Sequence, residues 1–286
     1  MQTRRIGELD VSAIGLGAMP MSIEGRPDEA RALATIHAAL DAGVTLIDTA
    51  DAYHLHADEV GHNETLIAKA LASHDRGADV LVATKGGHLR PGDGSWTLDG
   101  SPAHLKEACE ASLRRLGVEA IGLYQFHRPD PRIPYAESVG AIRELLDEGK
   151  IRAAGISNAD PRQIREANDI LGGRLVSVQN QFSPAFRSSE PELRLCDELG
   201  IAFLPWSPLG GISRARELGS SYAPFARVAE EHGVSPQRVC LAWELARSPV
   251  VVPIPGASRP ETILDSLAAT ELALTAAELA ELDAAV

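Results

Sequence analysis

The feature that most constrains this chain is a regular alternation of short apolar runs with longer amphipathic segments. Short runs rich in β-branched and apolar residues are typical of buried parallel strands, and the intervening segments carry apolar residues at helical spacing. The alternation therefore predicts repeated βα units around a parallel sheet. We expect eight strands, over residues 13–16, 45–48, 80–84, 121–126, 153–156, 176–179, 202–206 and 250–254.

Local signals at helix ends support this interpretation. Asp28 is a suitable N-cap for a helix over 29–41, in which apolar residues form one stripe before Gly43 ends the helix. Proline in a first helical turn and glycine after a last turn recur along the chain. These signals predict helices that open at Ser101-Pro102, Ile133-Pro134 and Asp160-Pro161 and end at Gly117, at Gly149 and near Gly172.

Eight such units within 286 residues favour a closed barrel over an open doubly wound sheet. We therefore expect an α/β fold, a (β/α)₈ TIM barrel, with residues 1–286 forming a single domain. Before the first barrel strand, segments 3–6 and 10–11 flank Gly7-Glu8-Leu9 and predict a small β-hairpin. This N-terminal hairpin would plug the N-terminal end of the barrel.

Composition excludes several classes of function. The chain has 27 Lys and Arg against 40 Asp and Glu, and its net charge of −13 argues against nucleic acid and anionic membrane surfaces as partners. No segment approaches the roughly 20 apolar residues of a membrane span, and the start lacks the apolar core of a secretion signal. We expect a cytoplasmic protein. Cys109, Cys196 and Cys240 lie far apart and are expected to be buried free thiols.

Four residues at or just beyond predicted strand ends form a coherent acid–base set: Asp48, Tyr53, Lys85 and His127. In a (β/α)₈ barrel, the loops that leave the C-terminal strand ends carry the chemistry. A lysine ammonium beside the tyrosine would favour the phenolate, and an aspartate would hold the ammonium in place. A neutral imidazole N–H would stabilise charge growing on a substrate oxygen. The set predicts proton transfer to or from a reacting oxygen.

The segments that hold these residues resemble motifs of the aldo-keto reductases, and the resemblance runs along essentially the whole chain. They are 48–53 (DTADAY), 83–85 (ATK) and 123–130 (LYQFHRPD), and residues 112–117, 149–152 and 155–158 also fit. The resemblance implies a (β/α)₈ barrel and NADPH-dependent reduction of aldehydes or ketones. It also implies catalytic roles for Asp48, Tyr53, Lys85 and His127.

The same resemblance implies a set of cofactor-binding residues. Three polar side chains would bind the nicotinamide carboxamide, an indole would stack on the ring, and a small-residue loop would contact the pyrophosphate. The last segment would hold the adenosine end, although for Gly17 and Met19 a simple turn role fits equally well. The set is Gly17, Met19, Asp48, Ser157, Asn158, Gln179, Trp206, Ser207, Leu209, Gly211, Gly256, Ser258, Arg259, Thr262, Asp265 and Ser266.

Two positions depart from the common pattern of the family and bear on the choice of cofactor. Ser266 stands where many members carry asparagine, and Thr262 replaces a frequent arginine or glutamine. Ser258 and Arg259, at a predicted helix start, supply donors for a 2′-phosphate. We therefore expect NADPH (NADP+), with NADH possible.

A loop rich in histidine and carboxylate side chains suggests metal binding as an alternative function. His54, His56, Asp58, His62 and Glu64 include ligand types, but their spacing matches no recognised ligand pair, and we expect no metal.

Substrate choice is not readable from the loops. Met19, Met21, His54, His88, Trp96 and Arg128 would face the cleft without a decisive pattern, so we expect a small-molecule carbonyl or alcohol. Two other functions stay open: an NADPH-binding regulatory subunit with little turnover, and a barrel isomerase or lyase that needs no cofactor. The oligomeric state also stays open.

Overall fold

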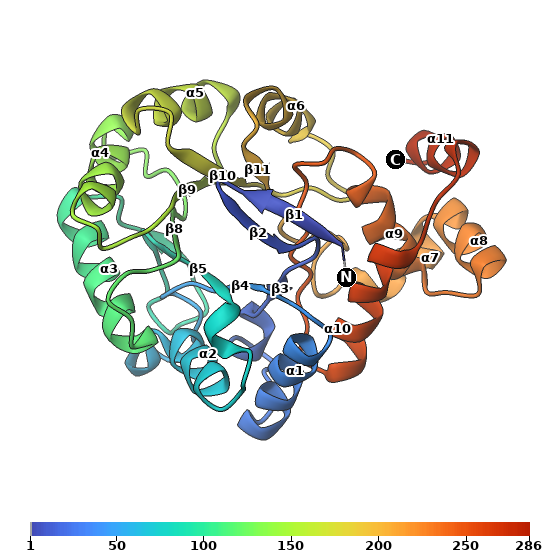
Figure 1. The fold of residues 1–286 in the computed structure, drawn as a ribbon, viewed down its shortest axis with the longest axis horizontal. Helices are drawn as coiled ribbons and strands as arrows, with labels where there is room; N and C mark the ends of the chain where they lie inside the picture. Colours follow the sequence, from blue (N-terminus) through green and yellow to red (C-terminus); the bar gives the residue numbers. More distant parts are fainter. Residues whose placement is uncertain (1) are drawn as a thin grey trace.

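The computed structural model describes residues 2–286. Seven parallel strands form one curled sheet, in the order β3-β4-β5-β8-β9-β10-β11, and helices cover its outside (Figure 1). Each strand overlaps one of the predicted strands. They are β3 (Leu16–Gly17), β4 (Leu46–Asp48), β5 (Leu81–Gly86), β8 (Leu123–Phe126), β9 (Ala154–Ser157), β10 (Leu175–Gln179) and β11 (Ala202–Phe203).

The eighth predicted strand, residues 250–254, closes the barrel without forming a regular strand. On the side of β11, the amide of Phe203 donates to the Val250 carbonyl at 2.9 Å, and Val252 donates back to the Phe203 carbonyl at 2.8 Å. The next bond of this ladder would need an N–H at position 205. Pro205 has none, so that bond is absent, although the Ile254 amide still donates to the Pro205 carbonyl at 3.3 Å.

The opposite side of this segment meets β3 in the same interrupted way. The amides of Gly15 and Gly17 donate to the carbonyls of Pro253 and Pro255, each at 2.9 Å. A hydrogen bond from residue 255 back to the Gly15 carbonyl is impossible because Pro255 lacks an N–H. The prediction of a regular strand over 250–254 is therefore wrong, while the closed (β/α)₈ architecture is confirmed.

The N-terminal hairpin is confirmed. β1 (Thr3–Ile6) and β2 (Leu9–Ser12) pair antiparallel, with Ile6 opposite Leu9, so the turn is shorter than expected. Ile6 and Val11 are buried among apolar side chains from the barrel strands. Figure 1 shows the hairpin lying across the end of the barrel. Its apolar residues therefore plug the interior, as predicted.

A second, unpredicted hairpin interrupts the loop after β5. β6 (His88–Leu89) and β7 (Thr97–Leu98) pair antiparallel, with His88 opposite Leu98. This hairpin, residues 88–98, stands at the mouth of the barrel where the catalytic set was predicted.

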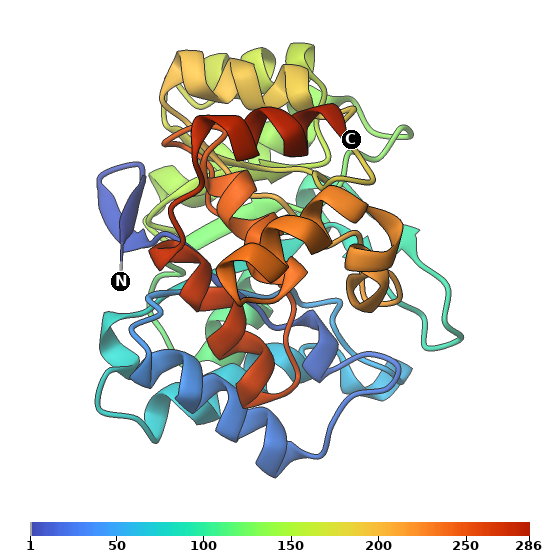
Figure 2. The same cartoon turned by 90° about the vertical axis from the view of Figure 1, so that its right-hand side faces the viewer.

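The helices begin and end where local signals predicted. The Asp28 carboxylate accepts the Arg31 amide, and Gly117 ends its helix with a φ of 67°. Figure 2 shows the C-terminal helices gathered on one side of the barrel. The helices are α1 (Glu29–Asp41), α2 (His62–Ala72), α3 (Pro102–Leu116), α4 (Tyr135–Asp147), α5 (Pro161–Ile170), α6 (Glu190–Leu199), α7 (Leu218–Ser221), α8 (Ala223–His232), α9 (Pro236–Leu245), α10 (Pro260–Leu267) and α11 (Ala276–Ala284).

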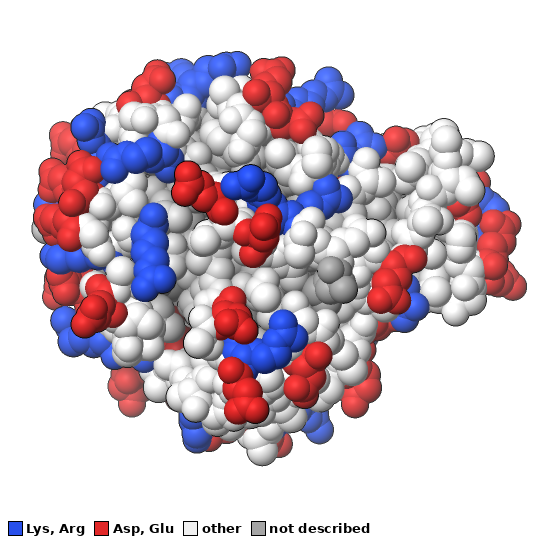
Figure 3. Space-filling view, in the orientation of Figure 1, with Lys and Arg blue, Asp and Glu red and all other residues white. Residues whose placement is uncertain are grey.

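Cysteines and surface charges agree with the composition. Cys109, Cys196 and Cys240 are buried and free, as predicted. Within residues 2–286, no helix is both long and apolar enough to span a membrane. Acidic and basic side chains are interspersed around the face seen in Figure 3.

Candidate active site

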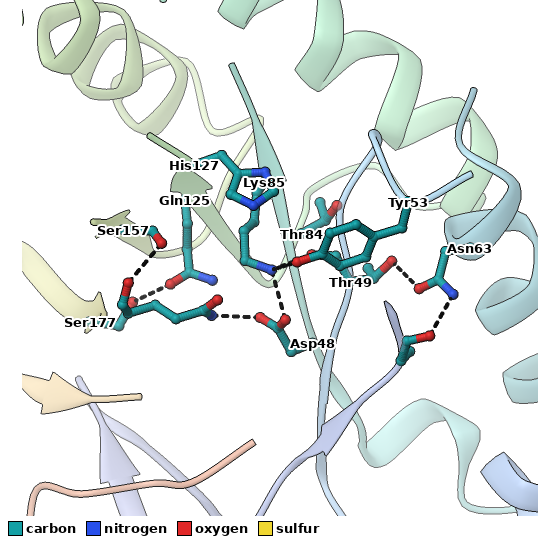
Figure 4. Close-up of polar contacts among 12 residues, drawn as sticks. Asp48, Thr49, Tyr53, Asn63, Thr84, Lys85, Gln125, His127, Ser157 and Ser177 are labelled. Atoms are coloured by element: carbon teal, nitrogen blue, oxygen red, sulfur yellow. Dashed lines mark hydrogen bonds and ion pairs between the residues drawn. The ribbon is translucent and has the colours of Figure 1, made fainter. Parts of the chain in front are cut away.

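The four residues of the predicted acid–base set meet at the C-terminal ends of neighbouring strands. Asp48 ends β4, and Lys85 is the penultimate residue of β5. His127 follows β8, and Tyr53 lies in the loop after β4. The Lys85 Nζ lies 2.7 Å from Asp48 Oδ1 and 3.2 Å from the Tyr53 hydroxyl (Figure 4). The Tyr53 and His127 rings meet edge to face, with centroids 5.8 Å apart. Residues 53 and 85 are therefore in direct contact.

Tyr53 is buried, and burial governs its protonation. Burial raises the pKa of the Tyr53 phenol above its ordinary value of 10, and the nearby Lys85 ammonium only partly offsets the rise. The prediction that the ammonium makes this phenol more acidic is therefore wrong in its net direction. The phenol therefore keeps its proton at neutral pH.

Lys85 and Asp48 form a buried ion pair whose polar atoms have further partners. Lys85 also donates to the Thr49 carbonyl at 2.7 Å, and Asp48 Oδ2 accepts from Gln179 Nε2 at 2.7 Å. Burial lowers the pKa of Lys85, but Asp48 and Tyr53 together raise it above its ordinary value. Burial raises the pKa of Asp48, an effect that Lys85 and Gln179 oppose. These extra bonds offset the desolvation of both charges.

His127 is held as a neutral imidazole. Burial lowers its pKa well below 6.5, and the positive charges of Lys85 and Arg128 add to this effect. Its Nδ1 is buried and has no hydrogen-bond partner among residues 2–286. A neutral imidazole carries one N–H donor, so this ring can donate to an oxygen in the pocket.

Asn63, at the start of α2, fastens the loop that carries Tyr53. Its Oδ1 accepts from the Thr49 hydroxyl at 2.6 Å, and its Nδ2 donates to the Ala18 carbonyl and the Ser22 hydroxyl at 2.9 and 2.7 Å (Figure 4). This role of Asn63 was not among the predictions from the sequence. The available signal was an amide side chain in the first turn after the Asp48–Tyr53 loop.

Several side chains of the histidine-rich loop have partners within the loop or elsewhere in the chain. His54 Nδ1 contacts the His56 carbonyl at 2.7 Å, and His62 Nδ1 contacts the Ser22 hydroxyl at 2.8 Å. Glu64 pairs with Arg115 at 2.6 Å. Across residues 2–286, no group of three or more histidine, cysteine or carboxylate side chains could hold a metal ion.

Asp51, between Asp48 and Tyr53, is a second feature that the sequence analysis missed. It is fully buried, its Oδ1 has no partner within residues 2–286, and burial together with the nearby Glu64 raises its pKa to about 8. Asp51 is therefore largely protonated at neutral pH.

A pocket of about 640 Å³ opens beside the four residues, and Asp48, Tyr53 and His127 of this set line it. Arg128 and three side chains of the 88–98 hairpin line it as well. Of the substrate-loop candidates, Met19, His88, Trp96 and Arg128 line it, whereas Met21 and His54 are not among the lining residues and are buried. The predicted cofactor residues that line it are Gly17, Met19, Asp48, Ser157, Asn158, Gln179, Trp206, Ser207, Leu209, Gly211 and Gly256.

The chemistry of this pocket suits a nicotinamide dinucleotide. The Ser157 hydroxyl donates to the Gln179 carbonyl at 2.7 Å, and Asn158 Nδ2 donates to the His127 carbonyl at 3.0 Å, so these side chains are held in place. The indole Nε1 of Trp206 is buried and has no partner within the described chain. Fixed amide and hydroxyl groups beside an indole can hold a flat, amide-bearing ring.

The remaining five predicted cofactor residues do not line this pocket: Ser258, Arg259, Thr262, Asp265 and Ser266. Arg259 is exposed at the N-terminus of α10, and its Nη2 lies 3.4 Å from the Thr262 hydroxyl. Asp265 pairs with Arg238 at 2.7 Å, and the buried Ser266 hydroxyl donates to the Thr262 carbonyl at 3.0 Å. Their roles toward a cofactor stay predictions.

Known proteins resemble this chain along nearly its whole length. Residues 13–286 match the model of the aldo/keto reductase family. An uncharacterized oxidoreductase from Schizosaccharomyces pombe is 34% identical, over 98% of this chain and 89% of the relative. A probable aldo-keto reductase 1 from Glycine max is 33% identical, over 97% of this chain and 86% of the relative.

Two solved structures show the same architecture. An aldo-keto reductase from Klebsiella pneumoniae, in complex with NADP and acetate, has a TM-score of 0.82 at 29% identity. A glycerol dehydrogenase from Gluconobacter oxydans has a TM-score of 0.84 at 28% identity. Each comparison covers 99% of this chain and 94% of the other.

Proposed function

Because this chain belongs to the aldo/keto reductase family, we propose that it reduces an aldehyde or ketone to the alcohol, or catalyses the reverse, with NADPH or NADH. The observation that carries the proposal is the 3.2 Å contact of the Lys85 ammonium with the Tyr53 hydroxyl beside the pocket. The Tyr53 hydroxyl is the proton donor, and the Lys85 ammonium that contacts its oxygen stabilises the phenolate left after proton transfer.

Tyr53 supplies the proton to the carbonyl oxygen in the direction of reduction. Its raised pKa keeps the hydroxyl protonated at neutral pH. Lys85 stabilises the phenolate that remains after transfer, and Asp48 fixes the ammonium at 2.7 Å. His127, a neutral imidazole, donates its N–H to the same substrate oxygen and so orients the carbonyl.

The pocket residues named above would hold the cofactor. Ser157, Asn158 and Gln179 would bind the carboxamide, the Trp206 indole would cover one face of the ring, and the segment 207–211 would contact the pyrophosphate. When bound, the reduced nicotinamide supplies the hydride that adds to the carbonyl carbon.

NADPH is the proposed physiological cofactor. The exposed guanidinium of Arg259 and the hydroxyl of Ser258 lie at the start of α10, where donors suit a 2′-phosphate. The Klebsiella pneumoniae relatives of known structure are in complex with NADP or NADPH, which supports this choice.

Parallel assays with NADPH and NADH test the proposal. We expect 4-nitrobenzaldehyde to be reduced with stoichiometric NADPH oxidation, and NADPH alone to quench the tryptophan fluorescence of the protein. Quenching without turnover across aromatic, aliphatic and keto substrates would instead indicate a cofactor-binding regulatory subunit. Turnover that needs no cofactor would indicate a barrel isomerase or lyase.

A further inference from the structure

Arg128 is the one pocket-lining residue whose charge has no counter-charge within residues 2–286. Two formally charged residues line the pocket, Asp48 and Arg128. Asp48 is neutralised by Lys85 at 2.7 Å. Within the described chain, no carboxylate lies within ion-pair distance of Arg128.

The Arg128 guanidinium uses little of its hydrogen-bonding capacity. Its Nη2 donates to Asn158 Oδ1 at 3.2 Å, whereas its Nε is buried without a partner among residues 2–286. A guanidinium has five N–H donors in a planar fork that matches a carboxylate. Burying part of a charged group without an acceptor costs free energy. A bound ligand that supplies the acceptor would offset this cost.

The groups around Arg128 add no negative charge. His127 is neutral, and burial together with the charge of Arg128 lowers the pKa of His88 to about 4, so His88 is neutral as well. Lys85 and Asp48 cancel each other. The pocket therefore carries one net positive charge at Arg128.

The proposed cofactor does not supply the missing anion. Asn158, the contact of Arg128, is proposed to hold the nicotinamide carboxamide, and a reduced nicotinamide ring is uncharged. The phosphates would contact 207–211, whereas the hydrogen-bond partner of Arg128 is Asn158. The anion that faces Arg128 is therefore a group of the substrate.

The 88–98 hairpin, whose His88 ring packs on His127 with centroids 4.9 Å apart, indicates what the rest of that substrate is. His88 and Trp96 of the 88–98 hairpin pack with ring centroids 4.6 Å apart, and both line the pocket together with Leu98. Aromatic and apolar side chains cover apolar substrate bodies. A single unpaired guanidinium balances one carboxylate, whereas a phosphate monoester carries close to two charges.

Resting on the proposed function, we infer that Arg128 selects carbonyl substrates that carry a carboxylate on an apolar or aromatic body. Arg128 forms a charge-assisted hydrogen bond with that carboxylate while the carbonyl oxygen meets Tyr53 and His127. Arg128 is thus a specificity-determining residue for oxo acids.

Matched acid and ester substrates test this inference. We compare 4-carboxybenzaldehyde with methyl 4-formylbenzoate, and 4-oxobutanoate with its methyl ester, for the wild type and Arg128→Met. The ester is the more electron-withdrawing substituent on the aromatic ring, so intrinsic reactivity favours the ester. A higher kcat/KM for the acid therefore reports recognition of the carboxylate.

We expect the wild type to prefer the acid in at least one pair by about tenfold or more in kcat/KM. In Arg128→Met, kcat/KM for that acid falls about 30-fold or more, mainly because KM rises. The kcat/KM for the matched ester changes less than about threefold. Arg128→Lys keeps the charge without the fork and recovers part of the preference. Arg152→Met, which removes an exposed cation at the far end of β9, leaves both substrates unchanged.

Equal loss for acid and ester in both pairs, or no loss for either, would overturn the inference while the proposed function stands. A raised KM for NADPH with an unchanged acid-to-ester ratio would assign Arg128 to the cofactor and overturn it too. If the wild type reduces neither member of either pair nor 4-nitrobenzaldehyde, the proposed function fails and the inference falls with it.

Discussion

At the scale of single residues, the site depends on the balance between burial and charge at Tyr53. Burial raises the pKa of the phenol, and Lys85 at 3.2 Å opposes the rise. The types of both residues and their places at strand ends were readable from the sequence. The net direction of the Tyr53 pKa shift was not readable from the sequence, because it depends on how completely the folded barrel removes water from the phenol.

The direction of the Tyr53 pKa predicts the pH dependence of catalysis. Reduction needs the protonated phenol, and its raised pKa keeps that form present until the pH exceeds about 10. We expect kcat/KM for reduction to stay level between about pH 6.5 and 9 and to fall only above pH 10. Alcohol oxidation needs the phenolate and rises with pH over the whole range. An alkaline limb centred between pH 7 and 9 would contradict this assignment.

Arg259 carries the prediction on cofactor preference. In Arg259→Ala, the KM for NADPH should rise about tenfold or more, and that for NADH should change little, because only NADPH has the 2′-phosphate. Initial rates at varied cofactor concentrations measure both values. Arg165→Ala, which removes an exposed cation on α5, is a useful comparison. Equal effects of Arg259→Ala on both cofactors would contradict the prediction.

At the scale of helices, strands and loops, features set by neighbouring residues were predictable and long-range contacts were not. The N-cap at Asp28 and the helix end at Gly117 depend on local hydrogen bonds and backbone conformation, and both lie where the sequence indicates. The contacts of Asn63 join residues through the tertiary fold. The hairpin at 88–98 is local, and its turn residues Pro91-Gly92-Asp93-Gly94 were a signal that the predictions above did not use.

Asn63→Leu tests whether the anchoring of the Tyr53 loop matters for catalysis. The change removes three buried hydrogen bonds and leaves Thr49, Ala18 and Ser22 without this partner. We expect a loss of about 3 kcal/mol in the free energy of unfolding and a fall of about tenfold in kcat.

Urea titration and steady-state kinetics at a temperature where the variant is folded give both quantities. Asn168→Leu, on the outer helix α5, is the matched control. A folded Asn63→Leu variant with the kcat of the wild type would show that this anchor does not position Tyr53.

At the scale of the whole molecule, the barrel closes through an interrupted segment. Phe203 bonds residues 250 and 252 on one side, and Gly15 and Gly17 bond residues 253 and 255 on the other. The apolar pattern of 250–254 predicted correctly that this segment closes the barrel, because an apolar run predicts that a segment is buried. Proline at 205 and 255 then decides which ladder bonds are absent.

The packing of the C-terminal helices contains a buried acid that makes stability depend on pH. Glu244 in α9 is fully buried, neither carboxylate oxygen has a partner within residues 2–286, and burial raises its pKa well above 4.5. Its folded pKa exceeds its unfolded pKa, so its contribution to stability is complete below about pH 4.5. That contribution is lost progressively as the pH rises toward the folded pKa.

Glu244→Gln removes this ionisation at nearly constant volume. We expect the variant to gain stability over the wild type as the pH rises, by about 1.4 kcal/mol per pH unit above pH 4.5 until the folded pKa is reached. Denaturant titrations of both proteins at pH 5, 6, 7 and 8 measure the difference. A difference that is constant over this range would mean that Glu244 is ionised in the folded protein.

Tyr53→Phe isolates the proton donor, because it removes one hydroxyl and keeps the ring. NADPH oxidation with 4-nitrobenzaldehyde should fall at least about a hundredfold, while quenching of tryptophan fluorescence by NADPH reports a dissociation constant within about twofold of the wild type. Turnover within about threefold of the wild type would contradict the claim that Tyr53 protonates the carbonyl oxygen.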